Sequence, residues 1–233
     1  MGQKKLHRFA EIQGFTNVFQ YPENMKGNWH RHFKNSHPII LELACGKGEY
    51  ALGLGRMYPG CNYVGVDVKG NRLWKGAKTA LAENLENVAF LRTQIDRITD
   101  YFNPGEIAGI WITFPDPQLR LSKMKKRLTH PKFLRLYKQV LSPGATLHLK
   151  TDSPDLYGFT REVISLFDLE VVEDLPDIQQ AGKIKPELEI KTHYEALDIA
   201  QSSRVHYLAF RIDSELPLVK DHLLKEIICE KAG

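Results

Sequence analysis

From residue 39 onward, short apolar runs alternate with longer segments in which apolar residues recur every three or four positions. The short runs are typical of buried strands and the longer segments of amphipathic helices. Strands are predicted over residues 38–43, 63–67, 88–92, 109–113, 146–150, 169–172 and 205–212. Helices are predicted over residues 49–57, 71–83, 131–140 and 154–167, and an amphipathic helix closes the chain. This alternation predicts an α/β fold with a doubly wound, mostly parallel, seven-stranded sheet and helices on both faces.

Two segments lack this pattern. Residues 1–38 are polar with scattered aromatic residues and are expected to form an irregular N-terminal arm. Residues 176–191 are too long for an ordinary connection and are expected to form a functional loop. A chain of 233 residues fits one domain, so residues 39–233 are expected to form a single catalytic domain.

Composition narrows the class of protein. Apolar residues make up 42% and charged residues 26% of the chain, which is ordinary for a globular protein. The sequence shows neither a run of about 18 apolar residues nor the apolar core of a signal peptide, so we expect a cytoplasmic protein without a membrane partner. Three cysteines without C-x-x-C spacing predict reduced thiols. His30, His32 and His37 have no acidic ligand cluster after them, so no metal site is expected.

Positive charge is concentrated in one segment. Residues 118–138 contain eight Lys and Arg residues and no acid, which exceeds the net charge of +4, so the rest of the chain is net negative. The basic residues are Arg120, Lys123, Lys125, Lys126, Arg127, Lys132, Arg135 and Lys138. Such a run is often a solvated face. This run directly follows residues 114–117, a proline-rich turn that contains a candidate active-site acid. Contact with a phosphate backbone is therefore favoured for Lys125, Lys126 and Arg127.

A glycine turn and two acids mark the first two strand ends, where ligands bind in open α/β sheets. Gly46 and Gly48 follow the first strand, Glu42 lies near its end, and Asp67 ends the second strand. The pattern also fits a dinucleotide motif, in which Asp67 would bind a ribose. A carboxylate at Glu42 would repel a pyrophosphate but suits a cationic, phosphate-free sulfonium, so a methyl donor is favoured over a dinucleotide.

Three more acids follow later strands. Asp116 lies between two prolines after the fourth strand, where a catalytic role is favoured over a simple Asx turn. Asp96, after the third strand, could reach the adenine of a cofactor or could cap a helix. Asp152 follows the fifth strand. The case for its functional role is weaker, because Asp152 or Ser153 could also cap the next helix. His148 and Asp152 lack a nucleophile elbow, which argues against a hydrolase triad.

From about residue 38 to 212 the chain resembles the bacterial tRNA (guanine-N7) methyltransferases. The matching segments are residues 42–48, 64–67, 114–117, 125–129, 151–152 and 192–195. The resemblance implies a Rossmann-like class I methyltransferase that uses S-adenosylmethionine to methylate N7 of a guanine in tRNA. The chain differs from the family pattern at Ala44, which replaces a glycine, at residues 118–122, where a Trp and basic residues are customary, and at Leu197, which replaces a basic residue.

The resemblance also implies roles for individual residues. Glu42, Gly46, Gly48, Asp67, Asp96 and Asp116 would bind the methyl donor, with Asp116 also at the reaction centre. Arg120, Asp152, Thr192, His193, Tyr194 and Glu195 would face the guanine or its tRNA. The alternatives are a methyltransferase for another RNA or a small molecule, a dinucleotide-dependent reductase, and a non-catalytic RNA-binding protein on the same fold.

Overall fold

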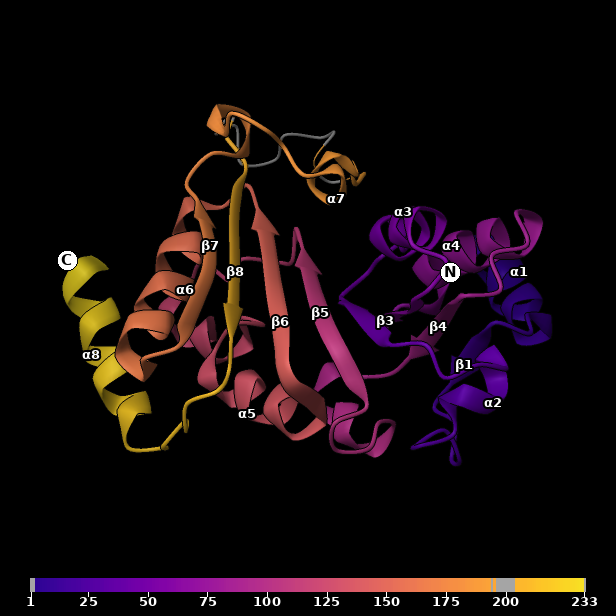
Figure 1. Cartoon of the computed structure of the whole chain (residues 1–233), viewed down its shortest axis with the longest axis horizontal. Helices are drawn as coiled ribbons and strands as arrows, with labels where there is room; N and C mark the ends of the chain where they lie inside the picture. The colour runs from indigo at the N-terminus through magenta and orange to yellow at the C-terminus, as the bar shows by residue number, and fades with distance from the viewer. Residues whose placement is uncertain (1–2, 194, 196–203, 233) are drawn as a thin grey trace.

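The described residues form one sheet of eight strands. The computed structural model describes residues 3–193, 195 and 204–232. The strands are β1 (Val18–Gln20), β2 (Ile39–Leu43), β3 (Asn62–Asp67), β4 (Val88–Arg92), β5 (Ile107–Thr113), β6 (Leu141–Thr151), β7 (Glu170–Leu175) and β8 (His206–Arg211). Their order is β1-β4-β3-β2-β5-β6-β8-β7. Neighbours from β1 to β6 are parallel, and β8 is antiparallel to β6 and β7 (Figure 1).

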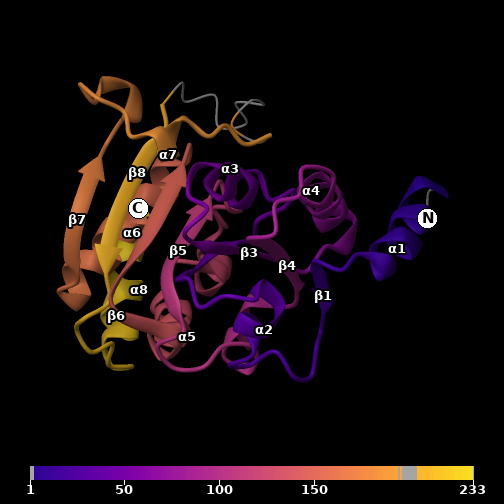
Figure 2. The same ribbon diagram turned by 45° about the vertical axis from the view of Figure 1, so that its right-hand side comes forward.

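Helices cover both faces of this sheet (Figures 1 and 2). They are α1 (Gln3–Glu11), α2 (Trp29–Phe33), α3 (Glu49–Met57), α4 (Gly70–Ala82), α5 (Pro131–Val140), α6 (Pro154–Phe167), α7 (Pro186–Glu189) and α8 (Lys220–Ala232). Short 3-10 helices occur at η1 (Ile12–Gly14), η2 (Ile95–Asp100), η3 (Leu121–Lys126) and η4 (Ile178–Gln180). One apolar cluster packs α2, α5, α6 and α8 against one face, and a second packs α3 and α4 against the other. The predicted α/β architecture is confirmed.

The N-terminal arm differs from the expected irregular segment and supplies the eighth strand. Within it, β1 pairs in parallel with β4 at the sheet edge, flanked by α1 and α2. Trp29 is fully buried, donates its indole N–H to the carbonyl of Tyr101 at 2.9 Å, and stacks on Phe102 with ring centroids 5.2 Å apart. Three-residue strands have no periodicity to detect, so this strand forms through tertiary pairing and leaves no pattern in the sequence.

Pro143 and Gly144, residues typical of turns, lie inside β6, which begins at Leu141. Gly144 has a φ of 73°, and the pairing of β5 with β6 shifts register between Ile107 and Gly109. The Pro-Gly pair therefore produces an irregularity within a longer strand, as glycine in a strand often does.

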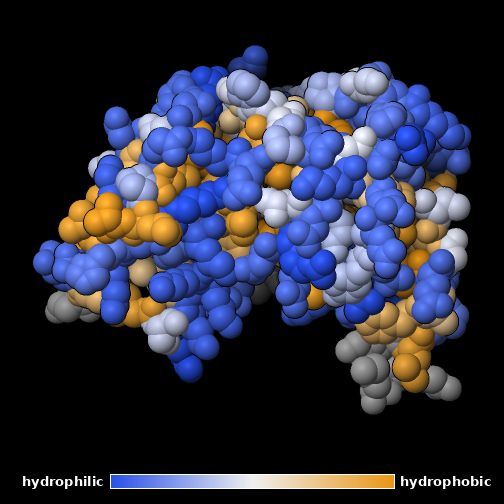
Figure 3. Space-filling model, turned by 90° about the horizontal axis from the view of Figure 1, so that it is seen from below, coloured by the Kyte–Doolittle hydropathy of each residue, from blue (hydrophilic) through white to orange (hydrophobic). Residues whose placement is uncertain are grey.

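Four parallel strands end at one edge of the sheet. Leu43 of β2 lies opposite Val66 of β3 and Ile112 of β5, and Thr113 lies opposite Lys150 of β6. The segments that follow β2, β3, β5 and β6 therefore emerge together, where α/β sheets bind ligands. The face at the opposite ends of the strands is largely hydrophilic with scattered apolar patches (Figure 3).

Candidate active site at the strand ends

The glycine loop, residues 44–48, turns the chain from β2 into α3. Gly46 and Gly48 have φ values of 57° and 70°, in the left-handed region that favours glycine. A Cβ at Gly48 would also lie 2.4 Å from the ring of Phe90, so this position requires glycine. Ala44 has a φ of 55°, a conformation that costs a non-glycine residue about 1 to 2 kcal/mol. This cost gives a physical reason for the glycine customary at that position.

Two acids bind backbone N–H groups in and next to the glycine loop. The Glu42 side chain is 3% exposed, and its Oε2 accepts the backbone N–H of Ala51, in the first turn of α3, at 2.8 Å. The hydroxyl of Thr113 donates to Oε1 of Glu42 at 3.4 Å. Asp67 accepts the N–H of Gly46 at 3.0 Å through Oδ2 and the N–H of Lys69 at 2.7 Å through Oδ1. Glu42 and Asp67 therefore lie at one site, and Glu42 is a buried acid that anchors α3.

Burial raises the pKa of Glu42 from its ordinary value of 4.5 to about 8, although the N–H of Ala51 opposes the shift. Between these pH values the folded protein holds a proton that the unfolded chain has released, so rising pH favours unfolding. The expected result is a free energy of unfolding that falls from pH 5 to pH 8 by at most about 1.4 kcal/mol per pH unit. Denaturant unfolding across this range should show a smaller slope for Glu42→Gln. Equal slopes in both proteins would contradict the prediction.

A rigid turn follows β5. Phe114 and Gln118 have φ values of 46° and 48°. The N–H of Phe114 donates to the carbonyl of Lys150 at 2.8 Å, which fixes the start of the turn to β6. Asp116 is exposed, and its Oδ1 accepts the N–H of Gln118 at 3.0 Å. The Asx turn is therefore present, and it occupies one carboxylate oxygen of Asp116.

Arg127 is buried in the protein, whereas a residue that contacts RNA would be exposed. Its side chain is buried, and its Nε donates to the carbonyls of Pro117 and Gln118 at 3.1 and 3.4 Å. Its guanidinium carbon lies 4.5 Å from the ring centroid of Phe159, and burial lowers its pKa. The guanidinium therefore holds the Asp116 turn in place, and its burial argues against the predicted contact with phosphate.

Four of the eight basic residues in the 118–138 segment are paired or buried. Lys132 pairs with Asp96, Arg135 with Asp221 and Lys138 with Glu215; Arg127 is the fourth. The remaining basic side chains are Arg120, Lys123, Lys125 and Lys126, all exposed and without a hydrogen-bond or ion-pair partner among the described residues. The positive surface of this segment is therefore limited to these four residues.

The alternative capping roles of the later acids fall to other residues. Asp96 lies in the first turn of η2 and not at its N-cap, which is Gln94. Ser153 caps α6 by accepting the N–H of Leu156 at 3.2 Å, so Asp152 is not the cap. Neither acid is explained by helix capping.

The loop before β8 is fixed to the strand ends by a residue that the sequence pattern did not single out. Lys150, at the end of β6, is fully buried, and its Nζ donates to the carbonyls of Leu188 and Ile190 at 2.8 and 3.1 Å. The same Nζ pairs with Glu195 at 3.0 Å. Burial lowers the pKa of Lys150, and the charge of Glu195 opposes that shift. A lysine near the end of a strand that is flanked by other buried strands is the one sequence signal for this role.

Lys150 brings part of the 192–195 motif to the strand ends. Thr192 is buried, and its hydroxyl accepts the N–H of Glu195 at 3.1 Å. His193 is exposed, and Tyr194 lies outside the described residues, as does Leu197. The Lys150 ammonium also lies 5.5 Å from the ring centroids of both Tyr50 and Phe114, which joins α3, the Asp116 turn and this loop.

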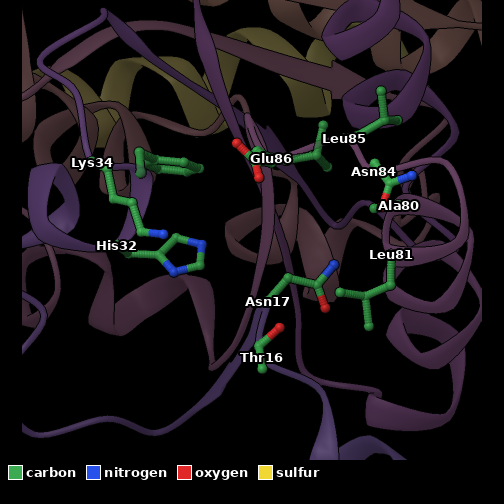
Figure 4. A pocket seen from close by; sticks show the side chains of 11 residues that line it. Thr16, Asn17, His32, Lys34, Ala80, Leu81, Asn84, Leu85 and Glu86 are labelled. Carbon is green, nitrogen blue, oxygen red and sulfur yellow. The ribbon is translucent and has the colours of Figure 1, made fainter.

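A separate pocket of about 340 Å³ lies at the opposite ends of the strands. Residues from the arm and from the end of α4 line it, among them Asn17, His32 and Asn84 (Figure 4). It contains none of the predicted site residues.

Among the described residues, no group of three or more His, Cys, Asp or Glu side chains could hold a metal ion, and no helix is long and apolar enough to span a membrane. All three cysteines are free thiols.

Several solved methyltransferases have a similar fold. The 16S rRNA methyltransferase KamB matches with a TM-score of 0.61 at 15% identity, covering 81% of this chain and 94% of that chain. A SAM-dependent methyltransferase from Aquifex aeolicus matches with a TM-score of 0.51 at 13% identity, covering 86% and 96%. The fold is therefore that of a Rossmann-like class I methyltransferase.

Sequence relatives narrow this class. The family described as "Putative methyltransferase" matches residues 36–208. A tRNA (guanine-N(7)-)-methyltransferase of Bacteroides thetaiotaomicron is 42% identical over 92% of this chain and 88% of its own. Those of Porphyromonas gingivalis and Christiangramia forsetii are 46% and 44% identical over 85% and 91% of this chain, and over 86% and 100% of their own. The chain belongs to the tRNA (guanine-N7)-methyltransferase family.

Proposed function

We propose that this enzyme transfers the methyl group of S-adenosylmethionine to N7 of a guanine in tRNA, in the cytoplasm. The observation that carries the proposal is the similarity to three relatives of that name over 85 to 92% of the chain. The strand-end site supports it, because Glu42 and Asp67 flank a glycine loop next to the Asp116 turn.

The site suits a cationic donor better than a dinucleotide. The N–H of Gly46, which a pyrophosphate would need as a donor, is already bonded to Asp67. The carboxylate of Asp67 beside the loop favours a positive ligand without phosphate, whereas the buried Glu42 side chain, whose pKa is raised to about 8, binds the N–H of Ala51. We assign donor binding to Glu42, Gly46, Gly48, Asp67, Asp96 and Asp116. S-adenosylmethionine supplies an electrophilic methyl group when bound.

The chain's residues need only orient the base and neutralise charge. Guanine N7 carries a lone pair and no proton, so its methylation requires no general base. Positioning alone can lower a barrier by about 7 to 11 kcal/mol at best. The base gains positive charge as the N7–carbon bond forms, and carboxylates at Asp116, Asp152 or Glu195 would stabilise that charge by accepting hydrogen bonds from the guanine edge. Arg120, Thr192 and His193 complete the proposed guanine side.

The test is direct transfer. Purified protein is incubated with methyl-labelled S-adenosylmethionine and unmodified tRNA, and the tRNA is digested to nucleosides. Label in 7-methylguanosine is the expected result. Label in a different nucleoside or in a small metabolite, or tRNA binding without any label, would overturn the proposal. The target base must be exposed or flipped to be reached, because the major groove of folded RNA is deep and narrow.

Replacing Lys125 and Lys126 by Ala is expected to weaken tRNA binding and reduce its salt dependence. Both ammonium groups are exposed and unpaired among the described residues, so each can release a counterion on contact with a phosphate. The slope of log K against log salt should become less negative by about 0.7 to 0.9 for each phosphate that is no longer neutralised. Filter binding at several salt concentrations measures it, with Lys34→Ala/Lys225→Ala as the control of equal charge. An unchanged slope would indicate a merely solvated face.

A further inference from the structure

A second basic surface lies on the face of the sheet that α3 and α4 cover, opposite to the face covered by α5 and α6. A hollow of about 510 Å³ opens between α3, α4 and residues 190–191. Lys47 of the glycine loop, Lys75 of α4 and Lys191 line it, and we call these three residues the lysine groove. The groove also contains Arg56 and a single acid, Glu49. Three separate segments of the chain thus bring positive charge to one hollow.

The three lysines of this groove differ from Arg56, the other basic residue that lines it. The guanidinium of Arg56 is satisfied by both carboxylate oxygens of Glu83, at 2.7 and 2.9 Å. By contrast, none of the three lysines has a hydrogen bond or an ion pair within the part of the chain that the structure describes. Unpaired like charges in one hollow repel one another and raise its positive potential, which an anionic partner would relieve.

The groove adjoins the candidate active site on the side away from η3. Lys47 stands between Gly46 and Gly48, and Lys191 directly precedes Thr192. Ile190 fixes this segment to α3, because it packs so closely on Gly53 that an added Cβ would lie 2.8 Å from its side chain. The groove packs with the cluster of α3 and α4, whereas Met124 of η3 belongs to the cluster of α5 and α6. Lysines therefore flank the strand-end site on both faces of the sheet.

The chemistry of the groove fits an extended polyanion. Its charges are carried by flexible side chains from three segments, and the groove is open, whereas a site for a single small phosphate would converge backbone N–H groups on one point. Phosphate contacts by lysine fix the register of an RNA without reading its sequence.

We propose that the lysine groove binds the phosphate backbone of the tRNA, so that the RNA crosses the strand ends and contacts both faces of the enzyme. This inference rests on the proposed function. It assigns to Lys47, Lys75 and Lys191 the orientation of the tRNA over the site, in addition to the contacts of the η3 lysines.

The test compares two double variants of equal charge. Lys75→Gln/Lys191→Gln removes two groove charges but leaves the glycine loop intact, and Lys34→Gln/Lys225→Gln removes two exposed charges outside the groove. For the groove variant, the slope of log K for tRNA against log salt should become less negative by about 1.4 to 1.8. We also expect KM for tRNA to rise several-fold, with the affinity for S-adenosylmethionine unchanged. The control should match the unmodified enzyme in all three measurements.

A groove variant with the salt slope of the control would overturn the inference, as would a loss confined to affinity for S-adenosylmethionine. The proposed function fails by a different result, the absence of 7-methylguanosine from tRNA treated with the unmodified enzyme. An enzyme that methylates tRNA while its groove variant keeps the full salt slope would leave the function standing and remove only this surface.

Discussion

Substituting Asp116 by Ala is expected to lower the rate of tRNA methylation at saturating substrates by about two to three orders of magnitude. One carboxylate oxygen of Asp116 accepts the N–H of Gln118, and the other has no hydrogen bond from the described residues. The turn that carries it is held on two sides, by Arg127 and by the carbonyl of Lys150. The turn therefore exposes one unpaired carboxylate oxygen of Asp116 at a position fixed by Arg127 and Lys150.

The Asx turn supplies a competing, purely structural explanation, and Asp116→Asn separates the two. Asparagine keeps an oxygen for the N–H of Gln118 but removes the negative charge. If charge is the reason for the acid, Asn and Ala should be impaired alike, and tRNA affinity should stay within about twofold. Single-turnover rates with saturating donor and tRNA make the comparison. An Asn variant with full activity would mean that Asp116 serves only to form the Asx turn.

Stability should change little in either variant, because Asp116 is exposed and loses at most one hydrogen bond, worth about 1 kcal/mol. Thermal unfolding of the Ala and Asn variants checks this point. A large loss of stability in the Ala variant would mean that its activity reports folding and says nothing about catalysis.

The sequence predicted the parts of this fold that rest on local pattern. Buried parallel strands are continuous apolar runs, and five of the seven expected strands, β2 to β6, are parallel neighbours that could be read in this way. Because parallel strands end at one edge, the strand ends alone placed Glu42, Asp67 and Asp116 on the same side of the sheet. The structure adds how two of these acids are used: Glu42 binds an amide in the first turn of α3 and Asp67 binds an amide of the glycine loop, which no spacing reveals.

The parts that the sequence could not predict depend on contacts between distant segments. β1 is defined only by pairing with β4, about 70 residues later in the chain. In the sequence, Arg127 cannot be distinguished from the exposed basic residues next to it, yet its guanidinium is buried and donates to the carbonyl of Pro117. Lys150 ends a strand next to a recognisable motif, but its role depends on a loop 38 to 45 residues away. A charged side chain carries no sequence mark of the partner that buries it.

Replacing Lys150 by Met is expected to release the segment that carries Thr192 and Glu195. The change keeps similar volume but leaves the carbonyls of Leu188 and Ile190 and the carboxylate of Glu195 without their donor. Breaking a buried pair by removing one partner costs about 3 to 5 kcal/mol. The carbonyls and Glu195 can recover hydrogen bonds by moving into water, so we expect the cost to appear mainly as local opening of the loop and less as global unfolding.

Amide hydrogen exchange measures this opening. Protection in residues 186–193 should fall in Lys150→Met while protection in β2 and β3 is retained. The matched control is Lys185→Met in the same loop, where an exposed ammonium pairs with Glu173 at 2.5 Å. An exposed pair contributes about 0.2 to 1 kcal/mol, so the control should keep its protection.

Activity should follow the loop. Displacing a substrate-positioning group by about 1 Å can lower a rate by about 100-fold, and we expect a loss of that size in kcat/KM for tRNA. Affinity for S-adenosylmethionine should stay close to that of the unmodified enzyme, because Glu42, Gly46 and Asp67 keep their own hydrogen bonds. Glu195→Gln, which leaves both carbonyl contacts of Lys150 in place, should retain more loop protection than Lys150→Met. A Lys150→Met enzyme with full loop protection and full activity would show that the buried ammonium is dispensable for placing Thr192 and Glu195 at the strand ends.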